Sequence, residues 1–327
     1  LCKRRGFVYP SSEIYGGFGG FWDFGPLGVE VKNNIKSLWW KYFVTDREDV
    51  FGLDSAIIMN PRVWEASGHT GPGFADPLRE CKKCHHRFRG DDLKDNNCSD
   101  CGGELTEEKK FSILVKTYIG PVEDTSTMAY LRGETAQAMF ANFKNILDSF
   151  HPKLPFGIAQ VGKAFRNEIT PGNFIFRSRE FEQMELEYFV LPEDDEKQFF
   201  NWREYCMSFL SKLGLKKDNL HFYDHPKEKL SHYSKGTTDI EYNFPFGWAE
   251  LWGISRRADY DLSQHAKFSG KKLIYQTAEG VEVKTYVIEP SVGVDRLFLA
   301  IMADAYFQDE KRLVLKLNHK LSPYKAA

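Results

Sequence analysis

The chain has 327 residues and a net charge of −2, with 42% hydrophobic and 28% charged residues. This composition is typical of a globular protein with enough apolar material for one large or two ordinary domains, and it excludes an intrinsically disordered chain. The charge does not by itself indicate nucleic-acid binding, although it leaves room for a local basic face. The sequence shows neither a bilayer-spanning apolar run nor a recognisable signal peptide, which predicts a cytoplasmic protein.

Glycine and aromatic residues crowd the segment 11–28, which predicts a loop that turns tightly around packed rings. A phosphate cradle is the weaker interpretation, because the segment has neither a GxGxxG pattern nor a Walker lysine. Apolar spacing then predicts a helix from Val29 to about Phe43, and a strand from Ala56 to Met59 that ends at Pro61. His69 has no partner at metal-ligand spacing, so we interpret it as structural.

Two CxxC knuckles with thirteen residues between them come next, at Cys81, Cys84, Cys98 and Cys101. Four thiolates in this pattern predict a tetrahedral zinc site. Such a closed site has no vacant position, so its role is expected to be structural. The alternative is four free cysteines or a redox pair. The segment 77–112 is therefore predicted to be an insertion tied together by metal.

The segment 127–147 contains Glu134 close to the start of an expected helix, where a carboxylate can simply favour the helix dipole. Two charged strands are predicted further on, over 165–168 and 176–185, joined by a turn at 171–173. The two-residue alternation gives these side chains common faces: Arg166 with Glu168, and Phe181 with Gln183 and Glu185. An arginine, a ring and carboxylates suit a ligand with a phosphate, a flat base and an ammonium group. A hairpin whose charges merely face water explains the same charges.

A helical pattern runs from Pro192 to about Leu215 and a polar stretch continues to Asp239, so 192–238 is predicted to be a second insertion. A strand expected from about 281 to 288 leads into a helix with Arg296 in its first turn. An arginine there is unfavourable for the dipole, which favours a ligand role. Strands mixed with helices and long insertions, without a βα repeat, indicate an α+β fold.

Three motifs now follow one another: the strand ending at Pro61, the stretch 165–168, and Gly293–Arg296 on a helix. Their order resembles motifs 1, 2 and 3 of the class II aminoacyl-tRNA synthetases. Further segments resemble one family of that class, the homodimeric glycyl-tRNA synthetases: 5–7, 13–17, 22–28, 64–69, 132–137, 181–185 and 289–291.

The resemblance implies a catalytic core built on an antiparallel sheet flanked by helices, and a homodimer interface near Pro61. It implies these divisions: the first part of the catalytic domain at 1–76, the zinc-binding insertion at 77–112, catalytic core at 113–191 and 239–310, the second insertion at 192–238, and the start of a missing anticodon-binding domain at 311–327. The implied reaction joins glycine to ATP, giving glycyl-adenylate and pyrophosphate, and then transfers glycine to tRNA(Gly). Mg²⁺ would assist, and Zn²⁺ would be structural.

Matching the motif positions, the resemblance implies catalytic roles for Arg166 on the α-phosphate, Glu250 on magnesium, and Arg296 on the adenine or the γ-phosphate. The implied ATP-binding residues are Arg166, Asn167, Glu168, Phe176, Arg177, Ser178, Arg179, Glu180, Phe181, Glu250, Leu251, Gly293 and Arg296. The implied glycine-binding residues are Arg89, Glu134, Phe181, Glu182, Gln183, Met184, Glu185, Arg257, Glu289, Pro290, Ser291 and Gly293. Arg87 and Arg256 remain open as alternatives to Arg89 and Arg257.

Glycine has no side chain to grip, so selectivity is expected to come from the ammonium group and from excluded bulk. The resemblance implies that carboxylates at Glu134, Glu185 and Glu289 hold the ammonium while Ser291 crowds the α-carbon. Excluding larger amino acids in this way needs no editing site. The main alternative function is an inactive, synthetase-like accessory or nucleic-acid-binding protein, against which the motif arginines and glutamates count. A zinc-ribbon nucleic-acid module would explain the cysteines alone.

Overall fold

The computed structural model describes residues 1–71, 74–93, 95–230 and 234–325. A seven-stranded sheet lies at its centre, with the strand order β12-β13-β14-β17-β11-β10-β3. Every neighbouring pair is antiparallel except β10 with β3, which is parallel. The strands are β3 (Val50–Gly52), β10 (Phe156–Phe165), β11 (Glu180–Val190), β12 (Leu220–Asp224), β13 (Gly236–Phe244), β14 (Gly247–Ala258) and β17 (Tyr286–Gly293). The predicted α+β class is confirmed.

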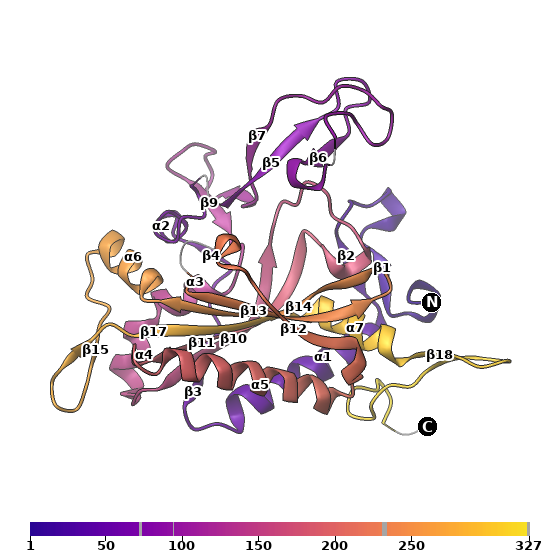
Figure 1. Ribbon diagram of the computed structural model, residues 1–327. Helices are drawn as coiled ribbons and strands as arrows, with labels where there is room; N and C mark the ends of the chain where they lie inside the picture. Colours follow the sequence, from indigo (N-terminus) through magenta and orange to yellow (C-terminus); the bar gives the residue numbers. More distant parts are fainter. Residues whose placement is uncertain (72–73, 94, 231–233, 326–327) are drawn as a thin grey trace.

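Three helices cover one face of this sheet: α1 (Pro26–Trp40), α5 (Asp195–Leu213) and α7 (Val294–Ala305). Figure 1 shows α5 and α1 below the sheet, with α7 beside them. Their apolar sides and alternate strand residues form the main core, which includes Trp39, Trp202, Met184, Trp252 and Phe298. Burial of these large apolar side chains helps to hold the sheet against its helices.

The other face of the sheet is covered at one end only. There α3 (Ala136–Ala141), α4 (Phe143–Phe150) and α6 (Tyr260–Ser269) lie over a second core that contains Phe140, Phe143 and Phe189. The short helix α2 (Pro61–Ala66) contacts α6 and α3. The part of this face towards β13, β14 and the start of α7 stays open, and it carries the cleft described below.

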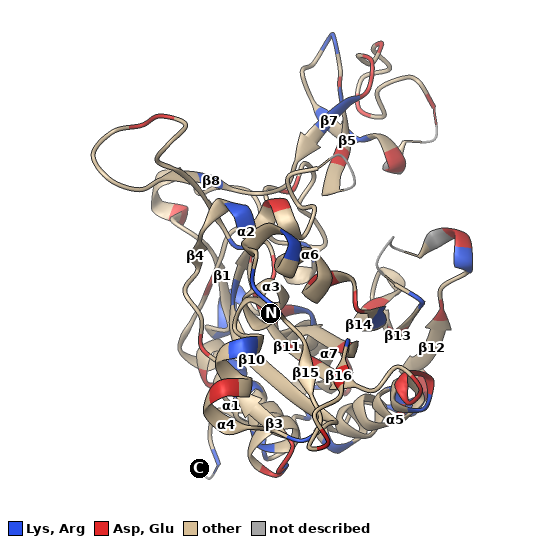
Figure 2. Ribbon diagram, turned by 90° about the vertical axis from the view of Figure 1, so that its left-hand side faces the viewer, with Lys and Arg blue, Asp and Glu red and all other residues tan. Residues whose placement is uncertain are grey.

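The cysteine-containing segment folds into a sheet of its own, with the order β6-β5-β7. Its strands are β5 (Ala75–Glu80), β6 (Arg87–Arg89) and β7 (Lys109–Ser112). Figure 1 and Figure 2 both show this unit standing away from the central sheet, and in Figure 2 basic and acidic residues are mixed along it. A further sheet at its base joins β4 (Ile58–Met59), β9 (Met128–Leu131) and β8 (Lys116–Tyr118).

Three small hairpins complete the structure: β1 (Val8–Pro10) with β2 (Trp22–Phe24), β15 (Tyr275–Gln276) with β16 (Glu282–Val283), and β18 (Tyr306–Gln308) with β19 (Leu313–Leu315). Residues after β19 return to the core, where Leu321 is fully buried and its carbonyl accepts a hydrogen bond from Asn34. Among the described residues, none of the helices combines the length and apolar character needed to cross a membrane.

The block 192–238, which the sequence predicts to be a second insertion, packs as part of the main body: α5 buries Phe199, Trp202 and Phe209 in the main core, and β12 is the edge strand of the central sheet. The aromatic residues of α5 lie on one side of the helix, and that side is stable only when it is buried. The helix therefore packs on the sheet and joins the main core. The strand expected over 165–168 ends at Phe165, so Arg166 and Glu168 lie in the connection to β11 rather than on a shared strand face. Backbone N–H groups of Arg166 and Asn167 instead donate to Arg179 and Ile113.

Candidate active site

A cleft of about 430 Å³ opens on the uncovered face of the sheet. β11, β14 and β17 form its floor, and the first turn of α7 and the segment 166–178 form its walls. Most of the predicted site residues line it: Arg89, Glu134, Arg166, Glu168, Phe176, Arg177, Ser178, Phe181, Gln183, Glu185, Glu250, Glu289, Ser291, Gly293 and Arg296. Segments far apart in the chain therefore meet at one site.

Four predicted residues lie on the opposite face of the same strands: Glu182, Met184, Leu251 and Pro290. Successive residues of a strand point to opposite faces, so the neighbours of Phe181, Gln183 and Glu185 cannot also line the cleft. Met184 and Leu251 belong to the main core, and Glu182 pairs with Lys32 and Lys36. The side chains of these four predicted residues therefore do not line the cleft.

Asn167, Arg179 and Glu180 also lie outside the cleft lining. Asn167 is exposed, and Glu180 pairs with Lys163 at 2.7 Å. The guanidinium of Arg179 donates to the carbonyl oxygens of Glu168 and Gly19, at 2.8 and 2.7 Å. Arg179 therefore links the segment between β10 and β11 to the N-terminal glycine-rich loop.

The two open arginine alternatives differ clearly in position. Arg257 is buried directly behind the cleft, where it donates to Glu289 and forms a fork with Asp261 at 2.8 and 3.0 Å. Arg256, its neighbour on β14, points the other way and pairs with Asp195 on α5. Arg89 lines the cleft and pairs with Asp76 at 3.2 Å, whereas Arg87 is exposed and pairs with Glu80. The structure thus favours Arg257 and Arg89 as site residues.

Three buried carboxylates gather at one end of the cleft, and each is held differently. Glu134 accepts from Gln137 at 2.9 Å and lies 3.2 Å from His69. Glu185 accepts from the backbone N–H of Thr135 at 3.1 Å and also from its hydroxyl. Glu289 accepts from Arg257. Their exposures are only 9%, 1% and 9%, so water cannot compensate their charge well.

The electrostatic surroundings separate these carboxylates. Burial would raise the pKa of Glu134, but His69, Arg257 and Arg166 outweigh it and hold that pKa well below its usual range. Burial and the charge of Glu134 raise the pKa of Glu185. Burial also raises the pKa of Glu289 to about 8, against the opposing effect of Arg257. A cationic group placed among them would favour their ionised forms.

Two arginines face the middle of the cleft. Arg166 donates to the carbonyl oxygen of Gly133 at 3.0 Å and lies 5.6 Å from the centre of the Phe181 ring. Arg296 pairs with Glu250 at 3.0 Å and lies 4.3 Å from the centre of the Phe176 ring. Arg296 therefore accompanies Phe176 here rather than the Phe181 ring. The cation of Arg296 lowers the pKa of Glu250, which favours its carboxylate form.

Asp239 and His225 line the cleft beside Glu250 and were missed in the sequence. His225 lies 2.7 Å from an Asp239 oxygen, and burial together with Glu250 raises the pKa of Asp239 to about 6. A Cβ added at Gly253 would lie 3.8 Å from an oxygen of each carboxylate, so the two acids flank one point of the floor. Their only sequence signal was the polar character of 216–239, because β13 and β14 pair across a bulge that sequence alone does not reveal.

Comparison with known proteins agrees with this geometry. Residues 121–305 match the model of the tRNA synthetase class II core domain (G, H, P, S and T). The whole chain aligns with the glycine–tRNA ligase of Caldanaerobacter subterraneus subsp. tengcongensis at 51% identity, covering 78% of that protein. The chain belongs to the glycine–tRNA ligase family. Glycine–tRNA ligases of Streptomyces coelicolor and Thermobifida fusca are each 54% identical to it, again over the whole chain and over 78% and 77% of their lengths.

A solved structure shows the same class II fold at far lower similarity. Giardia lamblia prolyl-tRNA synthetase in complex with prolyl-adenylate matches with a TM-score of 0.64 and 15% identity, over 87% of this chain and 48% of that one. The fold expected from the order of the three motifs is thereby confirmed.

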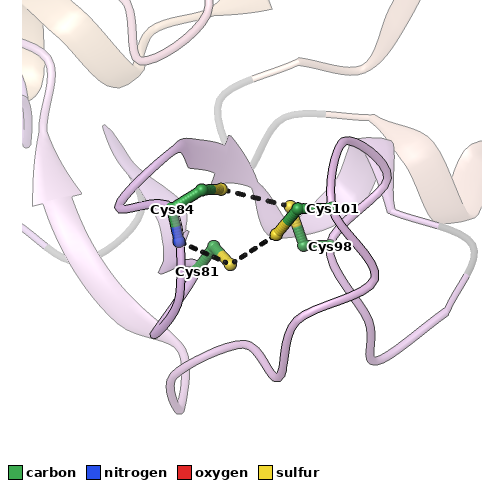
Figure 3. A group of neighbouring side chains, drawn as sticks. All are labelled: Cys81, Cys84, Cys98 and Cys101. Carbon is green, nitrogen blue, oxygen red and sulfur yellow. Dashed lines mark hydrogen bonds between the residues drawn. The ribbon is translucent and has the colours of Figure 1, made fainter.

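The four knuckle cysteines of this family member converge on one point (Figure 3). The sulfur atoms of Cys81 and Cys101 lie 3.5 Å apart, and those of Cys84 and Cys98 lie 3.7 Å apart. Tetrahedral Zn–S bonds of about 2.3 Å require sulfurs separated by about 3.8 Å, so the donor set fits a zinc ion. A Cβ added at Gly103 would lie 2.9 Å from the Cys81 sulfur, so the second knuckle needs glycine there.

Proposed function

We propose that this protein activates glycine with ATP and then transfers it to tRNA(Gly). The observation that carries the proposal is one cleft holding Arg166 and Arg296 at its centre and three buried carboxylates at its end. The relatives' name, glycine–tRNA ligase, supports the substrate assignment. Nothing favours an inactive accessory protein, since the motif arginines and glutamates are present and meet in the cleft.

The carboxylate end suits the ammonium group of glycine. Glu134, Glu185 and Glu289 supply negative charge in a site with little water, where an ammonium ion gains most from it. Ser291 stands directly across from Glu185 on β17, next to Gly253 on β14. Its side chain would occupy the space that a larger amino acid needs beyond the α-carbon, so exclusion of bulk would give the selectivity.

The arginine end suits the α-phosphate. Arg166, within 4.0 Å of Glu134, would contact both the glycine carboxylate and the phosphate that it attacks. Negative charge develops on the phosphate oxygens during attack, and a fixed guanidinium stabilises it without reorganisation. The attack forms a carboxylate–phosphorus bond, and the bond to pyrophosphate breaks. Positioning and charge stabilisation would supply the catalysis, with no covalent enzyme intermediate.

The adjacent carboxylates of Glu250 and Asp239 would hold a magnesium ion beside the ATP phosphates. Carboxylate oxygens are the ligands that Mg²⁺ prefers, and the ion usually keeps several waters. Bound there, Mg²⁺ would neutralise charge on the outer phosphates. Arg296 now pairs with Glu250, so it would have to turn towards the nucleotide when the ion binds. Zn²⁺ in the four-cysteine site would hold the β5–β7 unit, and with it Arg89, beside the cleft.

Glycine-dependent exchange of labelled pyrophosphate into ATP tests this function directly. We expect the wild-type chain to catalyse the exchange, and Arg166→Ala to reduce it at least a hundredfold, the order of effect of removing one preorganised donor. The exposed Arg87→Ala is the matched control and should leave the rate unchanged. A chain that binds ATP but shows no glycine-dependent exchange would refute the proposal. Homodimerisation through the Pro61 region is also proposed, and sedimentation analysis would measure it.

A further inference from the structure

Glu187 is the most deeply buried carboxyl group near the cleft. It follows Glu185 by two residues on β11 and therefore points to the same face, but it lies behind the cleft lining and is 0% exposed. Neither of its carboxyl oxygens has a hydrogen-bond partner among the described residues. An ionised carboxylate in such a position is strongly disfavoured.

Two other carboxyl groups lie close to Glu187. The flanking pairs Glu185↔Ser291 and Tyr188↔Ile288 put Glu187 opposite Glu289 on β17. One oxygen from each of Glu185, Glu187 and Glu289 lies within 4.8 Å of the other two. Like charges placed directly opposite across antiparallel strands repel, so the three groups cannot all be ionised in the empty site.

The hydrogen bonds indicate which of the three carries a proton. Glu289 accepts from the Arg257 guanidinium, and Glu185 accepts from the N–H and hydroxyl of Thr135. These donors favour the ionised form of each group and oppose the burial that raises both pKa values. Glu187 has no such donor. Burial and the charge of Glu289 raise the pKa of Glu187 well above its usual value, although Arg257 opposes them.

We propose that Glu187 is a protonated positioning residue whose hydroxyl donates to the Glu289 carboxylate and aims it at the ammonium group of glycine. This rests on the proposed function of the cleft. The neutral acid supplies a hydrogen-bond donor to the part of the Glu289 carboxylate that Arg257 does not contact. It adds no negative charge to the cluster of Glu185, Glu187 and Glu289. Arg257 and Glu187 then fix Glu289 from two directions, so the carboxylate is oriented before glycine arrives.

Two substitutions of similar volume distinguish a hydrogen-bond donor at Glu187 from an ionised carboxylate and from a residue that only packs. Glu187→Gln keeps a neutral donor, so the glycine KM in the exchange assay should stay within about twofold of wild type. Glu187→Met removes the donor and should raise the glycine KM about tenfold, while the ATP KM stays unchanged, as expected for loss of one hydrogen bond to a charged group. Glu204→Met, exposed on α5, is the control and should alter neither KM.

The opposite results overturn the proposal. An equal rise in glycine KM for Glu187→Gln and Glu187→Met would show that an ionised Glu187 is required. A lowered melting temperature for Glu187→Met with unchanged glycine and ATP KM would show that the residue only packs.

Infrared difference spectroscopy tests the proton without using activity. Wild-type protein minus Glu187→Gln should show the carbonyl-stretch band of a protonated carboxylic acid at neutral pH, and absence of that band would refute protonation. This measurement remains decisive if Glu187→Met does not fold. It also keeps the two proposals apart: a wild-type chain without glycine-dependent exchange refutes the proposed function, while the spectrum still reports the state of Glu187.

Discussion

Replacing Lys32 by Met should be among the most destabilising single changes outside the cleft. The Lys32 ammonium, on α1, lies 2.7 Å from Asp295 and 2.9 Å from Glu182, and its side chain is only 6% exposed. Met keeps the length of the side chain but removes the cation from buried Asp295 and leaves half-buried Glu182 with Lys36 alone. Breaking a buried ion pair in this way costs about 3–5 kcal/mol of unfolding free energy.

Lys36→Met, one helical turn further along α1, is the matched control. Lys36 contacts Glu182 at 3.1 Å, but its side chain is 27% exposed and Glu182 keeps Lys32 as a partner. Partly exposed pairs contribute about 0–1 kcal/mol, so the two variants should differ by about 2–5 kcal/mol. Chemical denaturation followed by circular dichroism, at pH 7 and moderate salt, measures this difference. Equal losses for the two variants would refute the reasoning.

The pH dependence gives a second check on Lys32. Although burial opposes it, the charges of Lys32 and Lys36 lower the pKa of Glu182 in the folded protein. A lowered folded pKa contributes stability that is present above the unfolded pKa, about 4.3, and is lost as the pH falls through the folded pKa. Without Lys32 that contribution shrinks. The gap between Lys32→Met and wild type should therefore narrow below about pH 4, and a gap that widens there would contradict the assignment.

Three further changes should have distinct results. Glu134→Gln should raise the glycine KM at least tenfold with little change in the ATP KM, because a carboxylate that His69 and Arg166 keep ionised becomes neutral; an unchanged glycine KM in the exchange assay would exclude it from ammonium binding. Gly103→Ala should lower bound zinc from about one per chain, measured by mass spectrometry, because its Cβ meets the Cys81 sulfur; full zinc content would contradict this. Ser291→Gly should permit measurable alanine-dependent exchange, and continued rejection of alanine would place the steric barrier elsewhere.

Residues in regular strands were the most predictable part of the site. Phe181, Gln183 and Glu185 line the cleft as their alternation predicts, and Arg296 stands in the first turn of α7 as expected. Their positions depend only on the local period of a strand or helix, which the sequence contains. The resemblance to a family then supplied Glu134 and Glu289, which no local pattern connects with β11.

The contacts that the sequence could not predict are those between side chains from distant segments. The sequence does not identify the partners of Lys32, which the packing of α1 against α7 buries between two acids. Asp239 and His225 meet Glu250 only because β13 pairs with β14, and that register includes a bulge. His69, interpreted as structural, shares a hydrogen bond with Ser67 and also contacts Glu134, a partner that the sequence does not indicate. Such contacts arise from tertiary packing.

The alternation of β11 explains why its sequence is so rich in acids. The odd-numbered residues from Phe181 to Glu187 face the cleft or lie just behind it, whereas Glu182 faces α1 and binds Lys32. Asp295 accepts from the backbone N–H of Glu182 and also binds Lys32. These contacts hold the start of α7 against β11 on the face that α1 covers. Arg296 follows Asp295 directly. The even face of β11 therefore fixes the helix turn that carries Arg296, while the odd face presents the groups that would meet glycine and ATP.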